Sequence, residues 1–91
     1  MANPKRITSS GQIFTGRGII ELISLASDDQ ASFADIYDGI YTDGIDNATH
    51  LWHIKTPAND YRDTDILNIP WKKGVFAIIA GTGAGVAVTI R

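Results

Sequence analysis

The stretch IPWKKGVFAIIAGTGAGVAVTIR, residues 69–91, decides the fold of this chain. Two apolar runs, 75–80 and 86–90, flank a spacer of Gly, Thr and Ala residues, which is typical of a β-hairpin with a glycine loop. In the second run, large apolar residues alternate with small or polar ones, so the large groups share one face of a strand. The sequence therefore predicts that this hairpin forms the core of a β-sheet protein.

Outward from the hairpin, short apolar runs bounded by Gly and Asp turns continue the strand pattern. The expected strands are 19–25, 32–38, 51–55, 65–71, 75–80 and 86–90, with shorter candidates at 7–10 and 12–15. In the run 19–25, strict alternation places Ile20 and Leu22 on one face and Ile23 and Leu25 on the other. About seven strands without an amphipathic helix predict an all-β fold, a small antiparallel β-sandwich or jelly roll.

Composition agrees with a single β-rich domain. The chain has 91 residues, fourteen Ile against four Leu, and nine Asp against the single Glu21, which favours strands and turns over helices. Residues 1–6 are expected to form an extended arm, because Pro4 lacks an amide donor, and residues 7–91 the domain. Segments 40–49 and 56–64 are polar and are expected to be surface connections.

Charge and residue types argue against several functions. The net charge of -2 does not favour nucleic acid as a partner, and the uncharged segment 74–90 is too short and too rich in Gly for a membrane helix. The chain contains no Cys and hence no thiol chemistry. Its N-terminus has a basic start but no apolar run typical of a signal peptide.

The candidate chemical sites are weak. The spacer 81–85 has the glycines of a phosphate loop, but a strand pattern follows it where a phosphate loop needs a helix. His50 and His53 are three residues apart, which in a regular strand places them on opposite faces, so we expect them not to share a metal ion. The acidic residues in and beside the polar segments 40–49 and 56–64 do not have the spacing of a calcium-binding loop and are interpreted as solvated turn residues. We therefore expect no enzymatic activity, no cofactor and no metal.

The order of the motifs is distinctive. A strand ending in Ile36-Tyr-Asp-Gly39, a step Ile69-Pro-Trp-Lys-Lys-Gly-Val-Phe76 and a final Val86-Ala-Val-Thr-Ile-Arg91 follow one another in the segment 18–91. This order resembles small β-sandwich structural proteins of tailed bacteriophages. The resemblance implies a non-enzymatic virion protein, made in the host cytoplasm, that binds the major capsid protein or another virion protein. Within that class it implies a capsid decoration or cement protein, often a homotrimer.

The candidate residues for partner binding lie in the predicted arm, in the loops and in the turn before the hairpin. Aromatic residues in or beside loops are enriched at protein interfaces, and basic residues at an arm or a turn can dock to a neighbour. The candidates are Pro4, Lys5, Arg6, Tyr41, Tyr61, Trp71, Lys72 and Lys73. Two alternatives remain open: a carbohydrate-binding β-module, with Tyr41, Tyr61 and Trp71 as the stacking platform, and an adaptor associated with the tail or fibres.

Overall fold

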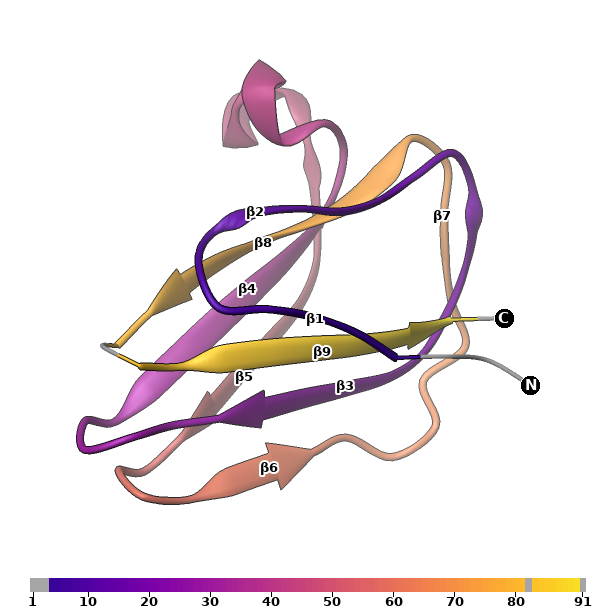
Figure 1. Ribbon diagram of the computed structural model, residues 1–91. Helices are drawn as coiled ribbons and strands as arrows, with labels where there is room; N and C mark the ends of the chain where they lie inside the picture. The colour runs from indigo at the N-terminus through magenta and orange to yellow at the C-terminus, as the bar shows by residue number, and fades with distance from the viewer. Residues whose placement is uncertain (1–3, 82, 91) are drawn as a thin grey trace.

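The computed structural model describes residues 4–81 and 83–90, which form two antiparallel sheets packed face to face (Figure 1). The strands are β1 (Pro4–Ile7), β2 (Gly11–Thr15), β3 (Gly18–Ala26), β4 (Ser32–Asp38), β5 (Thr49–Thr56), β6 (Tyr61–Asp63), β7 (Ile69–Trp71), β8 (Gly74–Ala80) and β9 (Gly85–Ile90). Two short 3-10 turns, η1 (Tyr41–Asp43) and η2 (Ile45–Asn47), connect β4 to β5. The predicted all-β sandwich is confirmed.

Sheet A has the strand order β1-β9-β3-β6, with β7 also paired to β3, and sheet B has the order β2-β8-β4-β5. The described residues hold nine strands, more than the seven expected, partly because the polar segment 56–64 contains β6. The predicted strand 65–71 is ordered as a strand only over β7, where Pro70 lies exposed on a three-residue strand at the rim of sheet A.

The predicted hairpin is wrong. β8 pairs with β2 and β4 in sheet B, whereas β9 pairs with β1 and β3 in sheet A, so the glycine-rich connection crosses from one sheet to the other. Gly81 and Gly83 have φ values of 112° and 79°, which favour glycine at both turns of this arch. Because both runs are apolar, each is buried as a central strand between two partners instead of pairing with the other.

The core lies between the sheets and follows the alternation of each strand. Val86 and Val88 of β9 and Val75 and Ala77 of β8 are fully buried there, as expected from the period of two. In β3 the alternation is broken by a register shift between Ile20 and Leu22. This β-bulge turns Ile20 to the side of Ile23 and Leu25, so the predicted pairing of Ile20 with Leu22 on one face is wrong.

The N-terminal arm is also corrected where the structure describes it. Residues 4–6 belong to β1, which pairs in register with β9 from Pro4 opposite Thr89 to Ile7 opposite Val86. The backbone of residues 4–6 is therefore part of sheet A. Residues 1–3, the rest of the predicted arm, lie outside the described residues. In the described part of the chain, no helix has the length and apolar character needed to cross a membrane.

Candidate functional site on the two sheet faces

An acidic side chain flanked by two imidazoles lies on the outer face of sheet B. Asp35 is on β4, and its Oδ1 atom lies 2.7 Å from Nδ1 of His53 and 3.0 Å from Nε2 of His50, both on β5. One carboxylate oxygen therefore accepts a hydrogen bond from each ring, with the tautomers set by that oxygen. The three residues are named the Asp–His cluster below.

The two histidines share a face because of a β-bulge. Ile36 lies opposite Trp52, but the next residue of β4, Tyr37, lies opposite His50, so Leu51 is an extra residue in β5. The extra residue reverses the alternation, and the prediction that His50 and His53 point to opposite faces is wrong. Adjacent apolar residues, Leu51 and Trp52, are the signal in the sequence that could have revealed the bulge.

Aromatic rings surround the Asp–His cluster. Phe33 contacts the His53 ring at 5.6 Å between centroids, and Tyr37 contacts the His50 ring edge-on at 5.2 Å. On the other side, Tyr37 stacks at 5.1 Å on Phe76, which is fully buried although it points away from the core between the sheets. The rings hold the cluster in place and leave its imidazoles half exposed.

Burial and the two histidines act in opposite directions on the pKa of Asp35. Partial burial of the carboxylate raises its pKa, but the hydrogen bonds and charges of His50 and His53 together outweigh burial, so the pKa of Asp35 lies below its ordinary value. The cluster is thus built around an ionised carboxylate. It offers hydrogen-bonding imidazole edges beside the exposed ring of Phe33.

The outer face of sheet A carries two of the predicted partner-binding residues. Arg6 on β1 and Tyr61 on β6 flank a hollow of about 200 Å³, and Tyr61 is 69% exposed. The floor of the hollow is made mostly of small residues from β3 and β9: Ser24, Ala26, Gly85 and Ala87. We name this surface the Arg6–Tyr61 face.

The remaining predicted residues are dispersed. Lys5 precedes Arg6 on β1, so its side chain points to the opposite side of the strand. Its Nζ atom lies 5.8 Å from the centre of the Phe14 ring, at the rim of the sandwich. Tyr41 lies in η1 at the end of sheet B, edge-on to Phe76. Pro4 belongs to β1, but its side chain is not described.

Trp71 is not an exposed platform. Its side chain is 3% exposed, stacks on Phe14 and donates a hydrogen bond from Nε1 to the carbonyl of Gly16. The prediction of Trp71 as a partner-binding or sugar-stacking residue is therefore wrong, because the end of the sandwich core needs a large ring there. Sequence alone did not distinguish this ring from one exposed beside a turn.

Lys72 and Lys73 form an exposed turn whose backbone is held by Asp38. The two carboxylate oxygens of Asp38 accept hydrogen bonds from the backbone N–H groups of Lys72 and Lys73, each with an N–O distance of 2.9 Å, and from that of Gly74 at 3.3 Å. Burial raises the pKa of Asp38, but the three backbone hydrogen bonds and the charge of Lys73 together outweigh burial, so the pKa lies below its ordinary value. The lysine side chains are left exposed at this corner.

The described residues contain no group of three or more His, Asp or Glu side chains arranged to hold a metal ion. Taken together, the fold and these surfaces define a small two-sheet β-sandwich with open polar and aromatic clusters on both outer faces. Comparison with known proteins adds no relative: no family model, no curated protein and no solved structure matches the chain.

Proposed function

We propose that this chain is a structural protein of a tailed bacteriophage particle, a decoration protein that binds the capsid exterior as a homotrimer. The resemblance of segment 18–91 supports the class. The observation that carries the docking surface is the Arg6–Tyr61 face, where two candidate residues from distant parts of the sequence flank one shallow hollow. The Arg6 guanidinium lies over Gly85, where a β-carbon would come within 2.6 Å of its nitrogens, and the other small residues of the floor leave room beside Tyr61. Tyr and Arg are residue types enriched at interfaces.

Symmetry explains how so small a surface would suffice. Each contact of one subunit is modest, but a trimer presents three copies to a particle site, and linked contacts add avidity. The first test is the solution mass of the purified chain by light scattering, where the proposal expects three times the 9.8 kDa of one subunit. A monomer would remove the trimer from the proposal.

The second test measures attachment. Particles of the phage that encodes the chain, prepared without it, are mixed with purified protein and sedimented, and occupancy is measured. Tyr61→Ala should lower occupancy at least tenfold, whereas Ile66→Ala, which alters a residue of similar exposure (67%) away from the Arg6–Tyr61 face, should not. Absence of saturable binding would overturn the proposal. Electron microscopy of decorated particles then separates capsid attachment from a tail or fibre adaptor.

A carbohydrate-binding module remains the second candidate, and the Asp–His cluster favours it. Sugars are bound by polar groups beside an apolar ring, and this cluster sets a carboxylate and two imidazoles next to Phe33, which is 40% exposed. A broad glycan array tests it. Binding that is lost in Phe33→Ala and kept in Tyr61→Ala would support this candidate, and silence across the array would count against it.

A further inference from the structure

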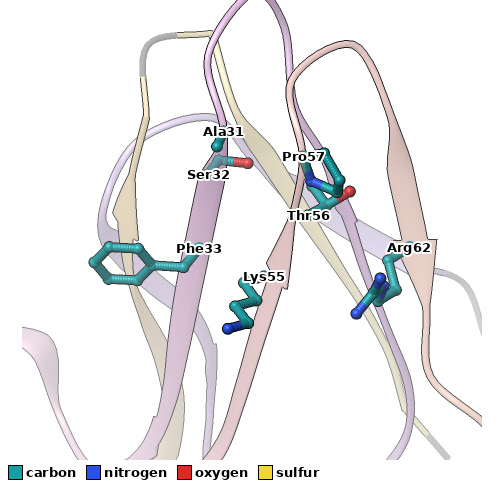
Figure 2. A pocket seen from close by; sticks show the side chains of 7 residues that line it. All are labelled: Ala31, Ser32, Phe33, Lys55, Thr56, Pro57 and Arg62. Carbon is teal, nitrogen blue, oxygen red and sulfur yellow. The ribbon is translucent and has the colours of Figure 1, made fainter.

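A groove runs between the edge strands of the two sheets. One hollow, of about 390 Å³, is lined by residues 31–33, residues 55–57 and Arg62 (Figure 2). A second hollow, of about 500 Å³, is lined by residues 52–55, residues 62–65 and Leu67. Lys55 and Arg62 line both, so the two hollows form one continuous surface, named the edge groove.

The lining of the second hollow places it beside the strand and not on one of its faces. Successive side chains of a strand point to opposite sides, so four consecutive residues of β5 can border one hollow only along the strand edge. Within the described residues, β5 pairs with β4 alone over its eight residues. Every second amide and carbonyl of β5 therefore faces the groove without a strand partner, which is the geometry that an added strand completes.

Charge is distributed unevenly along the edge groove. At the first hollow the charged lining residues are Lys55 and Arg62, and neither has a carboxylate within ion-pair distance among the residues described. At the second hollow, Asp63 and Asp65 join them. A negatively charged group is thus favoured at the end of the groove near the C-terminal end of β5.

Two buried hydroxyls at the same end have no hydrogen-bond partner. Ser32 and Thr56 lie opposite each other on β4 and β5, both are 4% exposed, and neither Oγ of Ser32 nor Oγ1 of Thr56 is bonded within the described residues. The Ser32 hydroxyl points toward the strand that carries Thr56 (Figure 2). Buried polar groups are normally satisfied, but these two hydroxyl oxygens are shielded from the surface and, by the alternation along β4 and β5, lie on the core side of sheet B, opposite the side chains of Phe33 and Lys55. They therefore mark an incompletely satisfied end of the core and not the site of the carboxylate.

We propose that the edge groove binds an extended peptide segment that adds a strand to β5 and places a carboxylate in the first hollow. Lys55 and Arg62, which line this hollow, hold the carboxylate. Main-chain hydrogen bonds to β5 supply affinity, and the attraction of the carboxylate to the two cations sets the orientation of the peptide along the groove. This inference does not depend on the proposed function, since it concerns a different surface and any protein can carry such a segment.

The test uses four synthetic hexapeptides of alternating Thr and Val. One ends in a free C-terminal carboxylate and one carries Asp near a blocked end; their partners replace these groups with an amide and with Asn. Backbone amide shifts of the folded protein are followed by NMR. We expect at least one acidic peptide to shift the amides of β5 with an affinity at least tenfold above its neutral partner. The two acidic peptides distinguish a terminal from a side-chain carboxylate.

Variants connect the effect to the groove. Lys55→Gln and Arg62→Gln should each remove most of the preference for the acidic peptide, while Lys72→Gln should leave it unchanged. The proposal is overturned if no peptide shifts β5 at millimolar concentration, if acidic and neutral peptides bind alike, or if β5 amides shift with protein concentration alone, which would indicate pairing of two copies.

Discussion

The indole ring of Trp71 lies so close to the backbone of Gly18 that a β-carbon at position 18 would come within 2.6 Å of the ring. The contact closes one end of the sandwich, where β7 pairs with the start of β3. Only glycine fits there, because the indole is wedged between this backbone and the ring of Phe14 and is anchored by its hydrogen bond to Gly16. Strand β3 and the Trp71 ring therefore depend on each other.

Gly18→Ala should destabilise the protein by about 1–3 kcal/mol, because the ring or the strand must shift to admit the methyl group. The free energy of unfolding is measured by urea denaturation. Gly11→Ala is the matched control, since a β-carbon at Gly11 meets nothing within 4 Å and should change stability by less than about 0.5 kcal/mol. Equal effects of the two substitutions would contradict the packing described here.

Asp35 should titrate differently when its histidines are replaced. In His50→Phe or His53→Phe one donor is lost and the pKa of Asp35 should rise; in the double variant burial remains and the pKa should pass the ordinary value of 3.8. Carboxyl carbon shifts in NMR measure it. Asp38 serves as an internal control, because its pKa is lowered by other donors and should not move.

The lowered pKa of Asp35 also makes the stability of the protein depend on pH. Because the pKa of Asp35 is lower in the folded protein than in the unfolded chain, its pairing stabilises the fold above the ordinary value of 3.8 and the benefit is lost as the pH falls through the folded pKa. Asp35→Asn should therefore reduce stability at about pH 6 and have little effect at about pH 2. A constant difference at both pH values would show that packing, not charge, explains the variant.

Asp38→Asn should cost about 1–2 kcal/mol, because a neutral amide replaces a carboxylate that accepts three backbone N–H groups. Thermal and urea unfolding measure the loss. Asp46→Asn, at an exposed residue of η2, is the control and should be nearly neutral. A neutral Asp38→Asn would mean that water satisfies the turn equally well.

Gly81→Ala should destabilise more than Gly44→Ala. Both glycines have positive φ, 112° and 83°, so each substitution strains the backbone. At Gly81 a β-carbon would also approach Cβ of Ser32 to 2.6 Å, whereas at Gly44 it meets nothing within 4 Å. The difference between the two variants in unfolding free energy isolates the steric part, and its absence would show that the arch has room to move.

The sequence predicts the strands and their buried faces correctly wherever large apolar residues alternate regularly with small or polar ones. The strand 32–38 has the predicted bounds, and Val86 and Val88 face the core as expected. The prediction from sequence is wrong where one extra residue changes the face of a side chain, or where one connection changes which strands pair. A single extra residue in β3 and in β5 reversed the faces of Ile20 and His50, and so hid the Asp–His cluster. The spacer 81–85 suits both a hairpin and an arch, and only the competition among all strands for partners decides between them.

Because β8 belongs to sheet B and β9 to sheet A, the order in which the two sheets can form is constrained. β8 lies between β2 and β4, and β9 lies between β1 and β3, so the middle of each sheet comes from residues 74–90. While the ribosome is still synthesising the preceding residues, β1 and β2 have no strand to pair with. The pairs β4–β5 and β3–β6 can form before residues 74–90 are made, but β1 and β2 gain a partner, and each sheet its middle strand, only when β8 and β9 are available.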